Sequence, residues 1–338
     1  MHFIGADLHK QTIRFHVVDQ ARRKIAAQTL ACSDPVRIRD WLAAFRPFQL
    51  VVEATASYEW FVQLIEPLAD RIVLAHPTKL RVIAESTRKS DKLDAQVLAE
   101  FLALDMIPAA HRPTPRQRQH RALVRQRYYL RKRTTSVKNR IRRILANYNA
   151  DFPELFTAET RRARKRIPVK VSAADRFVLM QLWREYDFHL QQIDAVEKAL
   201  RTFAESAPIP EAQARELLHT IPGVGVVTVE AFLSEVGDVR RFRSQKRVAA
   251  YAGLAPGQRE SAGKTQELNI THQGSRLLRW ALNQASWQLV RRDLRWRRIF
   301  EGLAERRGKK KAITAVSRRL LCVMASLVLN GQRYRPAA

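Results

Sequence analysis

Four acidic side chains in the N-terminal third of the chain have the chemistry and spacing of a divalent-cation site. Asp7 lies at or near the end of the predicted strand of residues 2–8, and Glu53 ends another apolar run. Asp91 and Asp94 are three residues apart, so both lie on one face of a helix. Carboxylates gathered in one place repel each other unless cations lie among them. Oxygen ligands of this kind are typical of Mg²⁺ or Mn²⁺ sites.

We therefore predict a metal site whose residues are catalytic. Two such ions about 3.5–4 Å apart can hold the attacking and leaving oxygens of a phosphoryl transfer. A simpler explanation stays open for each residue alone, because an Asp after a strand is usually a turn residue and an Asp pair is usually a helix cap or a solvated face. The predicted ligands are Asp7, Glu53, Asp91 and Asp94.

The elements predicted around these acids follow one known order. Three strands followed by alternating helices and strands is typical of the ribonuclease-H-like (RuvC-like) fold. In that fold the first and fourth strands are neighbours, which places Asp7 beside Glu53, and a helix across the same edge brings Asp91 and Asp94 to the same point. The predicted strands are residues 2–8, 12–18, 24–30, 50–53 and 71–75, and the predicted helices are residues 35–45, 57–68, 79–84 and 91–104.

The middle of the chain is predicted to be a long basic helical hairpin. Residues 106–150 contain no Asp or Glu, whereas thirteen Lys or Arg lie between Arg112 and Arg143. Apolar residues recur every seven positions, at 123, 130, 137 and 144, which indicates a helix with a narrow apolar seam. A second helix is predicted over residues 174–204, and we expect the two helices to pair antiparallel.

The cations of the first long helix are candidates for contacts with nucleic-acid phosphates. Thirteen cations without an acid are hard to keep folded unless a polyanion neutralises them, although a solvated helix face is the usual explanation of a charge run. Tyr128 and Tyr129 among the arginines could stack on unpaired bases. The candidate contacts are Arg125, Arg127, Arg131, Lys132, Arg133, Lys138 and Arg140.

The composition indicates a polyanionic partner and excludes several classes of protein. The chain has 338 residues, 46% of them hydrophobic, and a formal net charge of +29, which points to nucleic acid. It has no run of about 18 uncharged apolar residues and no signal-peptide pattern, so we expect a cytoplasmic protein without a membrane partner. Cys32 and Cys322 lie far apart, which argues against a disulfide scaffold and a thiolate zinc site.

The C-terminal part is predicted to be mostly helical. Residues 221–225 (Ile-Pro-Gly-Val-Gly) fit the hairpin of a helix–hairpin–helix element, in which Gly223 and Gly225 let backbone N–H groups approach a phosphate. An ordinary turn between helices is the alternative. Trp280 is expected in the core or at an interface. The predicted fold class is α/β followed by all-α, with domains at residues 1–106, 107–210 and 211–338.

These motifs resemble those of one family of bacterial mobile elements. Residues 5–7 (Gly-Ala-Asp), 53–58 (Glu-Ala-Thr-Ala-Ser-Tyr) and 89–95 (Lys-Ser-Asp-Lys-Leu-Asp-Ala) resemble the three acidic motifs of the RuvC-like DEDD transposases of the insertion-sequence-110 family. The resemblance covers nearly the whole chain in the same order. In the C-terminal half it includes residues 221–225, 236–238, 241–242, 249–256, Ser261 and 274–279.

The resemblance implies a mechanism and partners. It implies that the acidic residues hold magnesium and that Ser261 attacks DNA to form a covalent phosphoserine link. It also implies that a noncoding guide RNA pairs with donor and target DNA. Protomers would form a dimer or tetramer in which acids and serine from different chains complete one site. A serine hydroxyl needs activation, and the neighbouring cations Arg259 and Lys264 could stabilise charge on a phosphate.

Three functions remain open on the sequence alone. The first is a DNA transposase or recombinase that uses the acidic cluster and Ser261. The second is a magnesium-dependent nuclease, such as a junction resolvase, that uses the carboxylates without serine chemistry. The third is a nucleic-acid-binding scaffold without catalysis.

Overall fold

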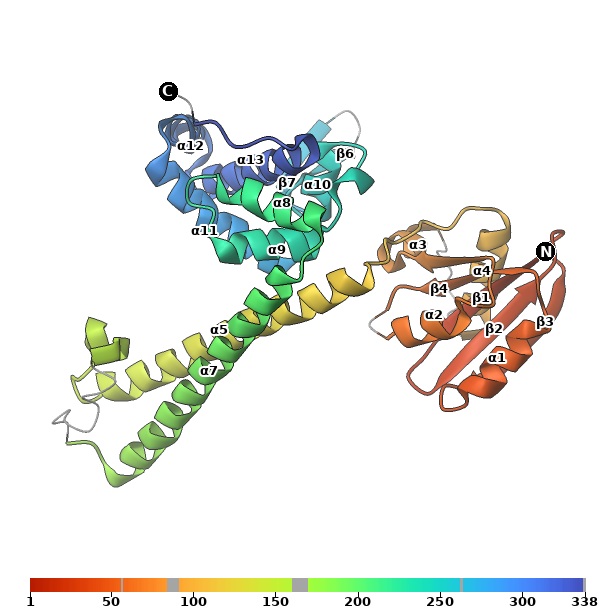
Figure 1. Cartoon of the computed structure of the whole chain (residues 1–338), viewed down its shortest axis with the longest axis horizontal. Coiled ribbons are helices and arrows are strands. Elements are labelled where there is room, and N and C mark those ends of the chain that lie inside the picture. Colours follow the sequence, from red (N-terminus) through yellow and green to blue (C-terminus); the bar gives the residue numbers. More distant parts are fainter. Residues whose placement is uncertain (56, 84–90, 160–169, 262–263, 337–338) are drawn as a thin grey trace. The chain divides into compact units, whose positions relative to one another are not determined.

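The computed structural model describes residues 1–55, 57–83, 91–159, 170–261 and 264–336, and the side chains of residues 81–83, 91–94, 258–261 and 264–268 lie outside the description. The described residues form two compact units, residues 1–112 and 113–338, and each is described by itself. A mixed sheet with helices comes first and mostly helices follow, which confirms the predicted order of fold classes (Figure 1). The three domain boundaries stay predictions.

The first unit is built on a five-stranded sheet of order β3-β2-β1-β4-β5. Strands β1, β2 and β3 pair antiparallel, whereas β1, β4 and β5 pair parallel. The first and fourth strands are neighbours, as predicted. The elements are β1 (His2–Leu8), β2 (Thr12–Val18), β3 (Lys24–Ala31), α1 (Pro35–Ala43), β4 (Phe48–Glu53), α2 (Glu59–Ile65), β5 (Arg71–Ala75), α3 (Pro77–Ile83) and α4 (Asp91–Ala103).

Side-chain alternation divides the apolar residues of this sheet between two faces. Ile4 and its even-numbered neighbours in β1 and β4 form one core cluster with residues of α1 and α2. Val51 belongs to a second cluster with Leu98 of α4, on the opposite face. Because successive side chains of a strand point to opposite faces, Asp7 and Glu53 share the face that α4 covers.

Gly5 lets α4 approach β1 closely. A Cβ placed on Gly5 would overlap with the carbonyl oxygen of Ala95 and lie 2.6 Å from the nitrogen of Ala99. Ala95 and Ala99 are completely buried, so small residues form both sides of this contact. The first turns of α4 therefore lie directly on the strand that carries Asp7.

We expect Gly5→Ala to destabilise the first unit by about 1–3 kcal/mol, because the added methyl group must push α4 off the sheet. The midpoint of urea unfolding measures this loss. Gly302→Ala is the matched control, since Gly302 in the helix Leu294–Arg307 has no heavy atom within 4 Å of a new Cβ. An unchanged midpoint for Gly5→Ala would show that α4 does not rest on Gly5.

The second unit consists of two long helices followed by a helical domain with one β-hairpin. The long helices are α5 (Pro115–Ala146) and α7 (Ala173–Glu205). The remaining elements are η1 (Pro153–Phe156), α8 (Ile209–His219), α9 (Val226–Val236), η3 (Val239–Arg241), α10 (Gln245–Tyr251), β6 (Pro256–Ser261), β7 (Lys264–Ile270), α11 (Arg276–Arg292), α12 (Leu294–Arg307) and α13 (Lys309–Asn330).

The two long helices pack along each other, which confirms the predicted helical hairpin (Figure 1). Of the positions predicted for the seam, Leu130 and Val137 are buried, but residues 123 and 144 are only half-buried. Val124, Ile141 and Leu145 are buried instead. The shift follows from helix geometry, because a seven-residue repeat drifts about 20° per heptad on a straight helix.

Helix α13 is the centre of the C-terminal core. Its buried residues, such as Val316 and Leu320, join residues of α8, α9 and α11 in one cluster. Among the described residues it is the one helix long and apolar enough to cross a membrane, with a mean hydropathy of 1.7 in its most apolar window. Eight of its residues are buried in the protein, which is typical of a core helix.

Candidate functional site

Asp7 and Glu53 lie next to each other at the carboxyl edge of the sheet. Ala6 of β1 pairs with Val52 of β4, and the two acids are the next residues of these strands. Both acids lie on the α4 face, the Asp7 side chain being 15% exposed and Glu53 half-buried. His9 places its Nε2 atom 2.9 Å from Oδ2 of Asp7. This arrangement places two residues with oxygen-donor side chains side by side at one edge of the sheet.

The backbone of α4 carries Asp91 and Asp94 toward the same edge. Asp94 directly precedes Ala95, whose carbonyl oxygen lies against Gly5, and Asp7 is two residues, or about 6.6 Å, further along β1. The side chains of Asp91 and Asp94 lie outside the described residues. Their part in the site therefore stays a prediction. The path of α4 along β1 is consistent with that prediction.

Two further polar groups lie at the carboxyl ends of the parallel strands. Oγ1 of Thr55 follows β4 and Nδ1 of His76 follows β5, and both atoms are buried without a hydrogen-bond partner among the described residues. A buried polar atom without a partner costs free energy, so a bound group that completes these interactions would be stabilised. This chemistry fits a hydrated divalent cation beside a phosphate.

The sequence analysis did not identify His9, Thr55 or His76 as site residues. The signals were present, since each is a polar residue placed just after the end of a predicted strand. A single polar residue in such a position is usually a turn residue, and only the sheet topology shows that three of them share an edge with Asp7.

Ser261 is the last residue of β6 and pairs with Lys264 of β7. Arg259, on the same strand as Ser261, pairs with Gln266. The side chains of Ser261, Arg259 and Lys264 lie outside the described residues, so their predicted roles are not tested. The backbone places all three on one short antiparallel hairpin.

Two glycines fix the base of this hairpin. Gly253 and Gly274 have φ angles of +70° and +116°, and a Cβ on either would overlap with the carbonyl oxygen of Gln273 or Tyr251 respectively. The nitrogen of Thr271 also donates a hydrogen bond to the carbonyl oxygen of residue 255 over 3.1 Å. The hairpin therefore starts from a tightly packed crossing of two backbone segments.

The predicted phosphate contacts on α5 differ in their availability. Arg125 pairs with Glu235 (2.8 Å) and Arg127 with Glu197 (2.7 Å). Arg131 also lies 3.8 Å from Glu197 but is half exposed. The sequence analysis assumed that these cations have no acidic partners. The segment itself contains none, but α7 and α9 supply carboxylates to it.

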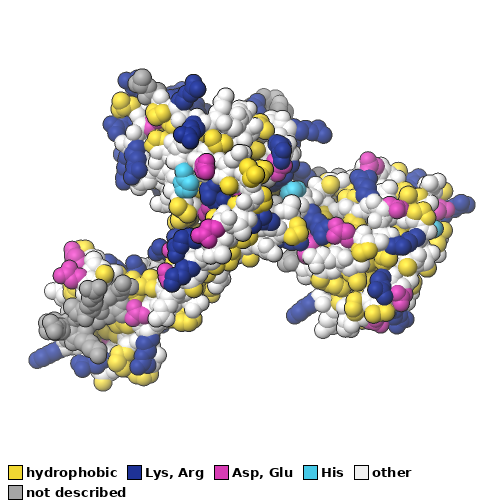
Figure 2. Space-filling view, viewed as in Figure 1, with side chains coloured by type: hydrophobic (Ala, Val, Ile, Leu, Met, Phe, Trp, Pro, Cys, Tyr) yellow, Lys and Arg dark blue, Asp and Glu magenta, His cyan; other side chains and the backbone are white. Residues whose placement is uncertain are grey.

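The other four predicted contacts of α5 are a half-exposed arginine, an exposed arginine and two lysines that lie near aromatic rings. Arg133 is half exposed and lies 3.6 Å from Glu185, and Arg140 is exposed. Lys132 lies 5.0 Å from the centre of the Tyr128 ring, and Lys138 lies 4.9 Å from that of Phe156. Figure 2 shows Lys and Arg side chains over the visible faces of both units. These cations are suited to phosphate contacts, which stay a prediction.

The two glycines of residues 221–225 have different surroundings. Gly223 has a φ angle of +81°, and a Cβ there would lie 2.7 Å from Cβ of Gln288, so this glycine serves the packing of α11. Gly225 is exposed, precedes the first residue of α9 and has no heavy atom within 4 Å of a new Cβ. Of the two, Gly225 has the space for a backbone contact with a phosphate.

A buried ionic network joins α5, α8 and α9. Glu230 is 6% exposed and accepts hydrogen bonds from Arg215 (2.7 Å) and from His120, whose Nε2 lies 2.6 Å away. Burial alone raises the pKa of Glu230, but the hydrogen bonds from His120 and Arg215 outweigh it and lower the pKa to about 2. The carboxylate is therefore charged at neutral pH and holds the three helices together.

This network predicts an acid-sensitive step in stability. Because the pKa of Glu230 falls from 4.5 to about 2 on folding, its contribution of about 3 kcal/mol is complete above pH 4.5 and is lost as the pH falls toward 2. Glu230→Gln should cost about 3–5 kcal/mol at pH 7, since it leaves Arg215 buried without its partner. Urea unfolding between pH 2 and pH 7 measures both effects. Glu216→Gln, an exposed residue of α8, is the control, and an equal loss there would contradict the assignment.

Two family models match the chain. A model of the DEDD transposases of IS110 matches residues 4–150, a range that contains Asp7, Glu53, Asp91 and Asp94. A model described as the transposase IS116/IS110/IS902 family matches residues 215–301, a range that contains Ser261. The two matched ranges together cover more than half of the chain and both groups of predicted catalytic residues.

Three similar proteins extend along almost the whole chain. The chain is 25% identical to the "Probable family 20 transposase" of Pseudomonas aeruginosa, over 98% of each protein. It is 24% identical to the "Transposase for insertion sequence element IS1111A" of Coxiella burnetii, over 99% of this chain and 92% of that protein. It is also 24% identical to the "Pilin gene-inverting protein" of Moraxella lacunata, over 98% of this chain and 97% of that protein. The matches at both ends and along the full length show that this chain belongs to the IS110 family of DEDD transposases, enzymes that recombine DNA.

Proposed function

We propose that this transposase cuts and rejoins DNA through a divalent-cation site at Asp7, Glu53, Asp91 and Asp94 and a nucleophilic hydroxyl at Ser261. The observation that carries the proposal is the pairing of β1 with β4, which puts Asp7 beside Glu53 on the face where α4 rests on Gly5. The buried atoms of Thr55 and His76 at the same edge, which have no hydrogen-bond partner among the described residues, support it.

The proposed ions are Mg²⁺ or Mn²⁺, since every proposed ligand is a carboxylate oxygen. When bound, they supply activation of a hydroxyl and neutralisation of phosphate charge. Asp7 and Glu53 hold them at the edge of the sheet, and His9 orients the Asp7 carboxylate from 2.9 Å away. Thr55 and His76 are positioned to hydrogen-bond to water or phosphate oxygens.

The proposed reaction of Ser261 has two steps. Its Oγ atom forms a bond to a DNA phosphorus, the P–O bond of the strand breaks, and the released DNA oxygen takes the bond's electron pair and a proton. A DNA hydroxyl from the other molecule then forms a bond to the phosphorus of the phosphoserine, the P–Oγ bond breaks, and the serine oxygen takes the electron pair and the proton that the hydroxyl loses. The positive charges of Arg259 and Lys264, on the same hairpin, would stabilise the phosphate in both steps.

The proposed partners are donor and target DNA, a noncoding guide RNA and further copies of this chain in a dimer or tetramer. The cations of α5 and the exposed Gly225 are the proposed contacts with phosphates. A cytoplasmic enzyme that acts on chromosomal and mobile-element DNA fits these partners.

The experiment that tests the serine mechanism looks for a covalent protein–DNA adduct. Wild-type protein incubated with end-labelled donor DNA and Mg²⁺ should give an adduct that survives denaturing gel electrophoresis, and mass spectrometry should place it on Ser261. Cleavage without any adduct would favour the second candidate, a nuclease that uses the carboxylates alone. That candidate is favoured by the pairing of β1 with β4, which places Asp7 beside Glu53 without involving Ser261.

A further inference from the structure

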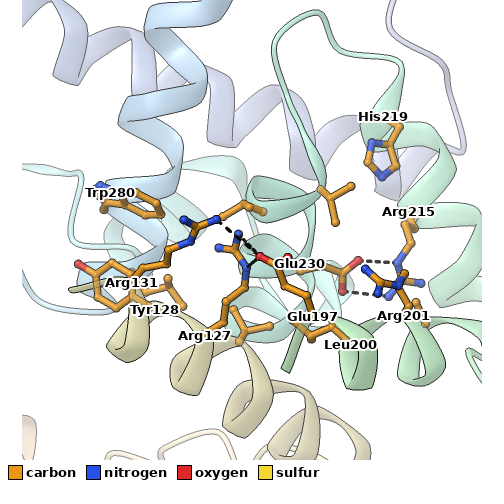
Figure 3. Close-up of a pocket in the computed structure, with 15 residues that line it drawn as sticks. Arg127, Tyr128, Arg131, Glu197, Leu200, Arg201, Arg215, His219, Glu230 and Trp280 are labelled. Atoms are coloured by element: carbon orange, nitrogen blue, oxygen red, sulfur yellow. Dashed lines mark hydrogen bonds and ion pairs between the residues drawn. The ribbon is translucent and has the colours of Figure 1, made fainter. Parts of the chain in front are cut away.

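A pocket of about 400 Å³ lies within the second unit, among the helices α5, α7, α8, α9 and α11 (Figure 3). Its volume lies within the range of about 300–1,000 Å³ that is typical of small-molecule sites. The described residues that line it all belong to the second unit and include none of the predicted catalytic residues. Its chemistry therefore needs a separate explanation.

One end of the pocket is aromatic. The rings of Tyr128 and Trp280 lie with their centres 5.3 Å apart, and Figure 3 shows them together at one end of the site. Trp280 is 39% exposed although it is a large apolar side chain. The inner wall includes the buried side chains of Val124, Leu200 and Leu277, which belong to one apolar cluster. A flat, apolar group would bury its faces against these surfaces.

The charged groups of the pocket carry a net positive charge. Four arginines line it against two glutamates. Arg127 and Arg215 are occupied by Glu197 and Glu230, at 2.7 Å each. Arg201 is exposed, and no ion pair within the described part of the chain involves it. The pocket therefore combines an apolar interior with a cation that can contact an anion.

The N-terminus of α9 forms another part of the lining. Val226 and Val227, the first two residues of this 11-residue helix, line the pocket. The N–H groups at a helix N-terminus favour an anion such as phosphate. Val226 is also 63% exposed, so this part of the lining lies at the protein surface.

We propose that this pocket takes up one unpaired base of a nucleic-acid strand, with the base against Tyr128 and Trp280 and its phosphate near Arg201 or the start of α9. A base within a duplex is stacked on both faces and would first have to be flipped out, which costs a few kcal/mol, so an unpaired base enters more readily. The Glu197 carboxylate, whose side chain is 33% exposed, only accepts hydrogen bonds, so it can accept one from an amino group or a ring N–H of the base. The proposal rests on the nucleic-acid partners of the proposed function but not on its chemistry.

The test compares the affinity for short single strands of DNA and RNA of one sequence with the affinity for duplex DNA, by fluorescence anisotropy in EDTA. Trp280→Ala should weaken single-strand binding about 5- to 100-fold and leave duplex binding unchanged. Trp60→Ala is the matched control, because Trp60 is 37% exposed but lies in the first unit. A loss with DNA alone or RNA alone identifies which strand enters, and equal affinities of wild type and Trp280→Ala for both would overturn the proposal.

A second variant fills the pocket and leaves the rings of Tyr128 and Trp280 in place. Val226→Trp adds bulk at a 63% exposed position of the lining and should lower single-strand affinity to the same extent. Ultraviolet crosslinking of strands with 5-iodocytosine should yield adducts on Tyr128 or Trp280, and adducts found only elsewhere would contradict the site. Because these measurements need neither metal nor Ser261, failure of the catalytic proposal would leave their outcome unchanged.

Discussion

The substitution Asp7→Asn is expected to lower the rate of DNA strand cutting by roughly 1,000-fold or more. Asp7 lies beside Glu53 across the pairing of β1 with β4, and an amide in place of one carboxylate removes a negative charge from the centre of the proposed cation site. The rate is measured with labelled donor DNA in the presence of Mg²⁺. Glu53→Gln should have an effect of the same order.

Folding and DNA binding should survive the loss of Asp7. The substitution removes repulsion between neighbouring carboxylates, so the free energy of unfolding without metal should stay the same or rise. Asp40→Asn is the control, because Asp40 is a 67% exposed acid on α1 of the same unit. Full cutting activity in Asp7→Asn would rule out the acidic edge as the catalytic centre.

The substitution Ser261→Ala is expected to abolish both the covalent adduct and recombination, because no other hydroxyl is proposed to attack the DNA. A plasmid carrying donor and target sites measures the recombined product by quantitative amplification. Ser244→Ala, an exposed serine that precedes α10, serves as the matched control. Recombination that persists in Ser261→Ala would show that the serine is not the nucleophile.

Mixtures of two inactive chains address the proposed assembly. If the acids and the serine of one site come from different protomers, Asp7→Asn and Ser261→Ala chains should restore recombination when expressed together, since some sites then combine an intact cluster with an intact serine. We expect this recovery. Its failure, with each chain still binding DNA, would place both parts of the site in the same protomer.

The fold of the first unit could be predicted from the sequence because apolar and polar residues alternate clearly along its strands. The segment 71–75 was predicted to the residue, and Asp91 was correctly predicted to begin a helix. The predicted ends of helices were less accurate. The helix predicted for residues 57–68 is shorter in the structure, where it spans Glu59–Ile65. Helix ends depend on capping contacts that a period alone does not specify.

Only the residues of the site that lie on strands could be predicted from the sequence. Asp7 and Glu53 follow from strand order, whereas the buried atoms of Thr55 and His76 depend on which segments cover the edge. Trp280 was expected in the core or at an interface but is 39% exposed beside Tyr128, since its place depends on contacts between α5 and α11. Tertiary packing of this kind leaves no periodic trace in the sequence.

The carboxylates that accompany the basic segment also limit how the enzyme responds to ionic strength. Of the thirteen cations from Arg112 to Arg143, at least eight have a carboxylate oxygen within 4.0 Å in the described part of the chain, so no more than five would displace condensed counterions from duplex DNA if every one of these pairs persists on binding. A plot of log affinity against log salt concentration would then have a slope of about −4.5 from this segment instead of about −12. The arginines that keep their carboxylate partners stabilise the packing of the protein instead of binding DNA. Affinity for DNA should therefore fall less steeply with salt than that of a helix whose thirteen cations all bind phosphates.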